Sequence, residues 1–362
     1  MKLPGEFAVH YETRNHWAVI TQLHGSVYIY IWKYCVFNVL MMLLDFFVFD
    51  DLMAKHGIKI TDKGHTISIF FVAFFCVTRA NMALARFNTA RSNLGGMLAS
   101  IRALTDAVAS HTMDDQTEAA KAWRNKLAYH SCLTLRVAMA ACDFEDKQVM
   151  PWDVPEMDDE TKTKIMRASQ SKGIADQWGY AKRTPKEEAY RVPFVMAQIL
   201  RMTLYEHKTA LEGGELPVGF LLKFNSLIDG FVNSYNAQNK MFTTPMPFPM
   251  VQMARTMMFL WVYTLPFALS SDGSTILVHC VVVMLLTYAF MGLETVSLQL
   301  DDPFGNDEND FDNLGMAKTV FEDVIRSIDM VDGTEWALKV RASMKGDPAE
   351  DKFPSESTSL LV

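Results

Sequence analysis

The sequence predicts an all-helical membrane protein, with four membrane-spanning helices and a large helical part on the water side. Three observations lead to this prediction. Although 50% of the 362 residues are hydrophobic, as in many soluble proteins, they are concentrated in a few dense runs. Outside these runs, apolar residues recur at intervals of three and four, which is typical of helices. Strand-type alternation is nearly absent along the chain.

Three apolar segments are the clearest predicted spans. The segment 275–293 carries no formal charge and on its own approaches the length of about 20 residues that a bilayer requires. The segment 26–49 is interrupted only by Lys33 near its start and Asp45 near its end, where charges reach the interface. The segment 256–269 is equally dense but shorter. We expect each to cross the membrane.

The remaining span, at about 64–85, has an apolar centre that is followed at once by Arg79 and Asn81. Such a helix is poorly suited to lipid but well suited to line a watery interior. Four spans place both termini and the long connection 91–246 on one side. Because that connection holds most of the Lys and Arg, and the turn 271–274 holds none, we expect this side to be cytoplasmic.

The host membrane stays open between the cell membrane and the chloroplast thylakoid. The first 25 residues resemble neither a cleavable signal nor a transit peptide, so we expect the first span to act as the targeting signal. Along the chain the sequence predicts the following parts: 1–25, an N-terminal segment; 26–95, the first two spans; 96–246, a water-side helical region; 247–300, the third and fourth spans; 301–345, an acidic turn and a C-terminal helical arm; and 346–362, a disordered tail.

Phe70, Phe74 and Thr78 lie on one face of the second span, because they are spaced at intervals of four residues. One explanation is that these side chains pack between helices. The other is that the face lines a central axis in a symmetric oligomer, where each Phe becomes a ring. An apolar ring can gate by dewetting, and the positive edge of an aromatic ring favours anions without any buried charge.

Arginines follow this stripe at the end of the span. Arg79 and Arg86 are seven residues apart and share a face, whereas Arg91 is rotated away from it. Charges at this depth line water or pair with acids. Spacing leaves two explanations open: an anion vestibule that includes Asn81, or an internal ion-pair network.

An acidic turn follows the fourth span directly, at 299–313. Asp302, Asp307, Asp310 and Asp312 crowd around a Pro-Phe-Gly bend. The spacing is not that of an EF-hand, because Phe311 occupies a ligand position. A solvated helix cap is one explanation. Binding of a hard cation is the other, since like charges this close are stabilised by a cation.

Several function classes are excluded by what the sequence lacks. It contains no Ser-His-Asp, Cys-His or paired-carboxylate constellation and no phosphate-binding glycine loop, so we expect no enzyme. The five cysteines show no metal-ligand spacing. A net charge of −8 argues against a broadly basic nucleic-acid surface, although it does not exclude a local anion path.

These motifs together resemble the bestrophin family. PFGNDENDF at 303–311 resembles the acidic signature after the last bestrophin span, and the Arg79, Asn81, Arg86, Arg91 and Gly95 pattern resembles that of the second span. PMPFPMVQ at 245–252 and HGSVY at 24–28 resemble the entries to the third and first spans. The resemblance runs from about 24 to 340.

The resemblance implies a homopentameric, passive anion channel for chloride or bicarbonate, embedded in a lipid bilayer. It implies neck rings at Phe70, Phe74 and Thr78. It also implies a calcium ion held by side chains of Asp307 and Asp310, with backbone oxygens near Gln299, Asp302 and Val9. Thr78 replaces a bulky apolar neck residue, and Asn306 and Asn309 dilute the acidic run of animal members, so calcium gating follows less directly than the channel.

Two other functions were weighed. A membrane-anchored helical scaffold without a conducting pore is the alternative, and it would have no use for Arg79 and Asn81 at membrane depth. A secondary transporter would be expected to show repeated halves and broken helices, and the sequence has neither.

Overall fold

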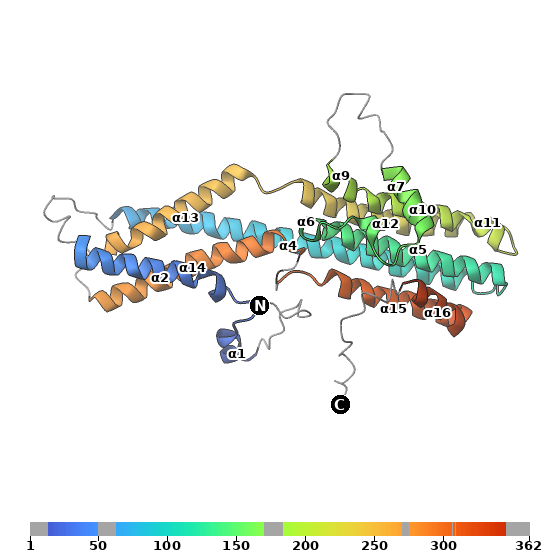
Figure 1. Cartoon of the computed structure of the whole chain (residues 1–362), viewed down its shortest axis with the longest axis horizontal. Helices are drawn as coiled ribbons and strands as arrows, with labels where there is room; N and C mark the ends of the chain where they lie inside the picture. Colours follow the sequence, from blue (N-terminus) through green and yellow to red (C-terminus); the bar gives the residue numbers. More distant parts are fainter. Residues whose placement is uncertain are drawn as a thin grey trace, which may run out of the picture.

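The computed structural model describes residues 14–49, 63–169, 184–269, 275–305, 307 and 309–344, and it is elongated and helical throughout this part (Figure 1). The predicted tail 346–362 and the position of Val9 lie outside the described residues. The helices are, in chain order, α1 (His16–Thr21), α2 (Tyr28–Leu44), η1 (Asp45–Phe49), α4 (Lys63–His111), α5 (Glu118–Cys142), α6 (Phe144–Lys147), η2 (Pro151–Asp153), α7 (Asp159–Ser169), α9 (Pro185–Ala189), α10 (Val192–Tyr205), α11 (His207–Ala210), α12 (Val218–Thr243), α13 (Phe248–Leu269), α14 (Ile276–Asp301), α15 (Asn313–Asp332) and α16 (Thr334–Ser343).

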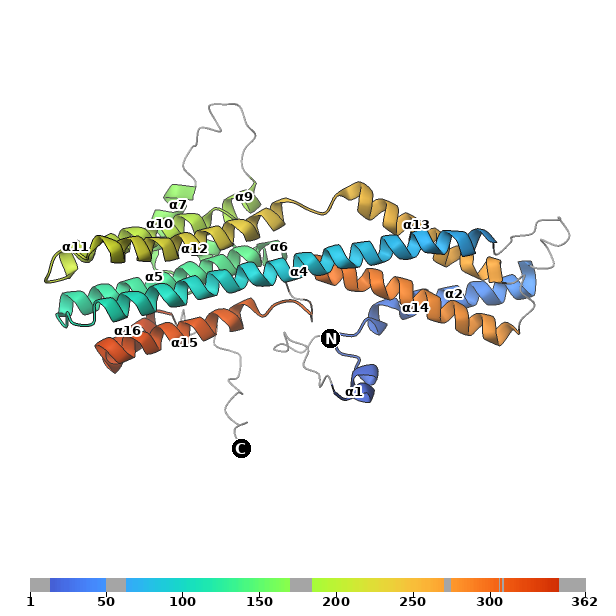
Figure 2. The same ribbon diagram turned by 180° about the vertical axis from the view of Figure 1, so that it is seen from behind.

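Helix α4 is the longest helix of the described structure and contacts both bundles. It runs unbroken for 49 residues, from the membrane end to the far water-side end (Figure 2). The sequence suggested a span at 64–85 and a separate water-side helical region from 96, and the structure joins the two in one helix. The residues between them include no proline, and Gly95 and Gly96 lie inside the helix without breaking it. A single rigid element therefore connects the membrane part to the water-side part.

The membrane end consists of α2, α13, α14 and the first half of α4. By length and composition, α2 with its extension to Val48, α4 and α14 could each cross a membrane. Helix α13 packs against all three and carries Pro266 inside it. The amide of Asn38 on α2 is fully buried and donates to Val262 O on α13 and to Thr287 Oγ1 on α14. This bridge joins three of the four predicted spans, and α4 packs against α13 and α14.

The water-side end is a larger bundle, in which α5, α12 and α15 pack against the second half of α4, and α10 packs outside them on α5 and α12. Its core is lined by Leu, Met, Ile and Phe side chains from all of these helices. Arg124 on α5 and Asp332 at the end of α15 form an ion pair with both side chains fully buried. The sequence suggested one helix from 314 to about 345, but Gly333, at φ +88°, divides it into α15 and α16.

Candidate functional site

The most distinctive surface is a bare face along α4. At the membrane end Phe70 is 75% exposed and Phe74 is 65% exposed, and Thr78 is half-buried. On the opposite face of the same turns, Val72 and Cys76 are buried against neighbouring helices. The neck residues suggested by the sequence therefore share a face that no other described part of this chain covers.

The bare face continues along the whole helix, and its chemistry changes on the way. We call it the α4 stripe. Its exposed members are separated by three, four or seven residues, so they stay in line. They are apolar in the membrane half (Ile67, Phe70, Phe74 and Val77) and mostly polar in the water-side half (Asn81, Leu84, Asn88, Ser92, Ala99, Arg102 and Asp106).

Behind the stripe lies a buried cluster of charges. The Nε of Arg79 donates to both carboxylate oxygens of Glu294 on α14, at 2.9 and 3.1 Å. Arg255 on α13 donates to the same carboxylate at 2.7 Å. Arg79 and Glu294 are 3% and 7% exposed. Of the two explanations that spacing left open, the geometry of Arg79 is that of the ion pair, while Asn81 is exposed on the stripe.

Arg86 fastens the junction between the two ends of the molecule. It donates to the carbonyls of Met241 and Thr244, at the end of α12, and its Nε lies 2.9 Å from an oxygen of Asp301, the last residue of α14. The side chain is only partly exposed. Its charge is therefore engaged by three local partners.

The acidic turn folds tightly over this junction. The Asp307 amide donates to Asp310 Oδ2 at 2.7 Å, and the Phe311 amide donates to Pro303 O at 3.0 Å. Gly305 has φ +147°, and a Cβ built there would meet the Asp146 carboxylate. The turn thus requires glycine for both its backbone conformation and its close contact with α6.

Asp146 is a neighbour that the sequence reasoning did not identify, because it lies in a different segment of the chain. Burial and the nearby Asp307 carboxylate raise the pKa of Asp146 above its ordinary value. Burial, then the carboxylates of neighbouring aspartates, raise the pKa of Asp310 to about 7. Both shifts have the same physical cause, which is crowded carboxylates with little water between them.

The residues suggested for calcium are partly assembled. Asp310 is buried, and its Oδ1 has no hydrogen-bond partner. An unpaired buried carboxylate oxygen fits a ligand of a cation. Asp302 and Asp307 are exposed, and the Gln299 side chain accepts from Asn309 at 3.1 Å. Within the described part of the chain, no three His, Cys, Asp or Glu side chains converge to hold a metal. The suggested set has only two carboxylate side chains, and backbone oxygens would supply its other ligands.

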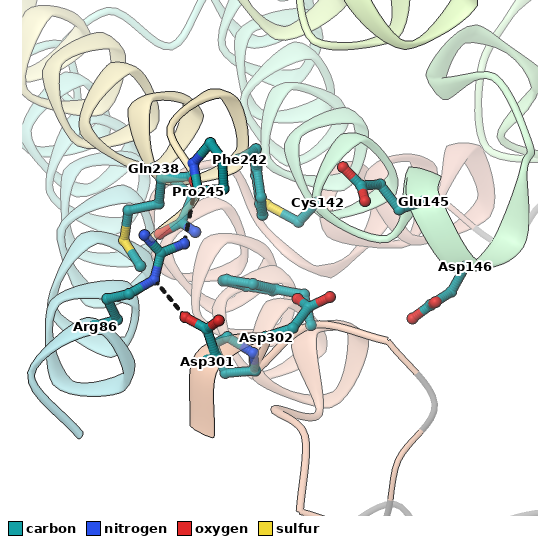
Figure 3. Close-up of a pocket in the computed structure, with 12 residues that line it drawn as sticks. Arg86, Cys142, Glu145, Asp146, Gln238, Phe242, Pro245, Asp301 and Asp302 are labelled. Atoms are coloured by element: carbon teal, nitrogen blue, oxygen red, sulfur yellow. Dashed lines mark hydrogen bonds and ion pairs between the residues drawn. The ribbon is translucent and has the colours of Figure 1, made fainter. Parts of the chain in front are cut away.

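A cavity of about 200 Å³ opens at the same junction (Figure 3). Arg86, Gln238 and Asp301 line one side, with Arg86 beside Asp301, and the carboxylates of Glu145 and Asp146 line the opposite side, with Asp302 between. Gln238 is fully buried, and its Nε2 has no partner in the described structure. The acidic turn, α4, α6 and α12 therefore all line this cavity.

Aromatic contacts connect the acidic turn to α4. The Phe311 ring lies 4.6 Å from the ring of Phe87 on α4 and 5.6 Å from that of Phe304. Phe304, which is 4% exposed, also packs against Phe242 on α12. A displacement of the acidic turn would consequently reach α4 within four turns of Phe74.

Comparison with known proteins agrees with this fold. A bestrophin homologue from Klebsiella pneumoniae matches with a TM-score of 0.67 in one variant, at 19% identity, over 84% of this chain and 99% of that one. A second variant gives 0.66 at 18% identity, over 82% and 98%. Another solved membrane protein gives 0.68, also at 18% identity. Identities this low show a shared fold.

The sequence matches are consistent with this. A voltage-dependent anion channel-forming protein from Ralstonia nicotianae is 29% identical over 116 residues, which span only 32% of this chain and 37% of that relative. The family model described as bacterial/fungal bestrophin protein matches residues 8–325, which is most of the chain. This chain therefore belongs to the bestrophin family.

Proposed function

We propose that the protein is a passive anion channel whose pore is lined by the α4 stripe from several copies of the chain. The observation that carries the proposal is the continuity of the stripe through both halves of α4. Contact with lipid would explain an exposed Phe70 or Phe74, but it would not explain why the same line stays bare after it becomes polar. An ion path that narrows in the membrane and widens into water explains both halves.

The assembly proposed is a homopentamer, as the family resemblance implies. In one chain, α12 and α15 flank the water-side half of α4, and α13 and α14 flank the membrane half (Figure 2). Among the described residues, the stripe is the face of α4 that these helices leave uncovered, and it is the face that would line an axis. The name of the Ralstonia nicotianae relative, which refers to an anion channel-forming protein, supports the same function.

In this proposal, rings of Phe70 and Phe74 form the neck. Apolar rings of this kind close a pore by dewetting, and their positive edges attract an anion that has shed part of its water. Thr78 at the water-side end carries a hydroxyl, which would hydrate that end of the neck. Small monovalent anions, chloride or bicarbonate, suit such a passage.

The proposal includes calcium at the acidic turn. The side chains of Asp307 and Asp310 and backbone oxygens of Gln299 and Asp302, with the segment near Val9, would hold the ion. Bound calcium would supply the positive charge that the crowded carboxylates lack. The contact between Phe311 and Phe87 provides a path from this turn to the neck helix.

A scaffold without a pore is tested by the same material. The buried pair of Arg79 and Glu294 gives Arg79 a structural use, so its presence at membrane depth no longer separates a channel from a scaffold. The mass of the solubilised particle separates the two functions, because a monomer could not enclose a central pore.

The function is tested by chloride flux from liposomes that contain the purified protein. We compare wild type with Phe74→Ala and with a matched control, Phe37→Ala, on the exposed face of α2. We expect flux in the wild type, altered gating or selectivity in Phe74→Ala, and no change in Phe37→Ala. An unchanged Phe74→Ala would remove the neck assignment, and absence of wild-type flux would remove the channel.

A further inference from the structure

The proposed neck has no formal charge of its own. The membrane half of the α4 stripe that contains it, Ile67, Phe70, Phe74 and Val77, is apolar throughout, and Thr78 is uncharged. Aromatic edges favour anions only weakly compared with a full charge. A pore that separates anions from cations therefore needs a source of positive potential near this segment.

Such a source lies directly behind the end of the neck. Arg79 follows Thr78 in α4 and turns away from the stripe into the bundle, where it meets Glu294. Arg255 joins from α13, with its Nε 2.7 Å from the same carboxylate. Two guanidinium groups thus share one carboxylate, and the cluster keeps one positive charge in surplus. In the described structure no second acid pairs with Arg255.

The neighbouring ion pair along α4, between Arg86 and Asp301, does not cancel this surplus charge. Arg86 is matched by Asp301, so that pair is neutral. Arg79 and Glu294 have side chains 4% and 8% exposed, whereas that of Arg255 is 38% exposed. The neutral pair is therefore the inner part of the cluster, and the surplus charge belongs to Arg255.

We infer that Arg255, held by Glu294 against Arg79, is a residue that sets the anion preference of the pore. This inference rests on the channel proposed above. The Arg255 side chain is 38% exposed, so its field is screened in part, but less than that of a fully exposed surface charge. In a symmetric assembly each copy adds the same sign of potential around the axis, and anions are enriched there while cations are repelled.

The arrangement also explains why Glu294 is present at all. Without it, the buried guanidinium group of Arg79 and the partly exposed one of Arg255 would repel each other close to the membrane. With it, Arg79 is neutralised and Arg255 stays charged. Removal of Arg255 should accordingly leave a complete pair of Arg79 and Glu294, so the fold should survive while the surplus charge is lost.

The test measures the permeability ratio of chloride to potassium from reversal potentials in planar bilayers with a salt gradient. For Arg255→Gln we expect this ratio to fall by roughly threefold or more, the order expected for one partly screened charge near the path. Arg255→Lys keeps the charge and should keep the ratio. Lys164→Gln, which removes an exposed charge from α7, is the control and should also keep it.

Arg255→Met removes the charge while keeping an apolar stem, so it repeats the test if the glutamine variant is not recovered. A wild-type ratio in a conducting Arg255→Gln or Arg255→Met channel would overturn the inference. An equal loss in Arg255→Lys would overturn it too, because the contact rather than the charge would then matter. Absence of any wild-type chloride current would instead defeat the channel itself.

Discussion

Arg79 donates from its Nε to both carboxylate oxygens of Glu294, although 215 residues separate them in sequence. The contact fixes α4 against α14 at the level where the membrane bundle ends. Its two partners are almost fully buried. The position of the neck helix in the bundle therefore depends on a charge pair as well as on apolar packing.

Buried pairs in the two ends of the molecule should respond differently to the loss of an arginine. Arg124→Ala leaves Asp332 fully buried without its guanidinium partner. We expect the free energy of unfolding to fall by about 3–5 kcal/mol. Arg79→Ala should cost less, since Glu294 retains Arg255. Thermal unfolding of the purified variants in detergent gives the order. If Arg79→Ala were the more damaging, Arg255 would not be compensating for it.

The glycine of the acidic turn should resist substitution. Gly305→Ala brings a Cβ against the Asp146 carboxylate and forces alanine into a positive φ. We expect the free energy of unfolding to fall by about 1–3 kcal/mol. Gly213→Ala is the matched control, because a Cβ there meets nothing within 4 Å. Equal melting temperatures for the two variants would show that the turn does not press on α6.

The buried carboxyl of Asp310 should make the turn sensitive to pH. It titrates near 7 in the fold and near 4 in an unfolded chain. Between these values the folded protein holds a proton that the unfolded chain has lost, so stability should fall as pH rises from about 4 to about 7.

Asp310→Asn should remove most of that slope, and the smaller remainder should come from Asp146, whose pKa is also raised. The amide oxygen of the new side chain can still accept from the Asp307 amide, and no charge is buried, so at pH 8 without divalent cations we expect the variant to be more stable by about 1–3 kcal/mol. Melting temperatures between pH 4 and pH 8 provide the measurement, with exposed Asp114→Asn as the control. A slope in Asp310→Asn as steep as that of the wild type would mean that Asp310 is not the group that titrates.

Calcium dependence should disappear when both carboxylates are removed. We expect Asp307→Ala combined with Asp310→Ala to abolish any effect of calcium on the current, because these are the charged ligands of the proposed site. Currents are recorded with calcium present and after chelation. If wild-type current ignores the chelator, the acidic turn is structural in this protein.

Local spacing was enough to predict that Phe70, Phe74 and Thr78 share one face of α4, because a helix repeats every 3.6 residues. Their role as a neck stays a prediction. The same reasoning could not choose a role for Arg79, since its partner Glu294 lies on α14. That glutamate closely follows the uncharged segment 275–293, where a lone acid is itself a signal of a buried partner.

Tertiary contacts account for what the sequence reasoning missed. Asp146 meets the acidic turn only because α6 folds back over the end of α14, and no periodicity reports this. The division of the C-terminal arm at Gly333 had a local signal, a glycine after a run of helical periodicity, which the continuing apolar pattern outweighed.

The account depends most directly on where α4 lies in the assembled particle. An image of the purified protein by electron cryomicroscopy at side-chain resolution measures this. We predict five copies around one axis, with the Phe70 and Phe74 side chains pointing into a continuous passage. Side chains turned outward into lipid, or an axis filled by other helices, would contradict the channel.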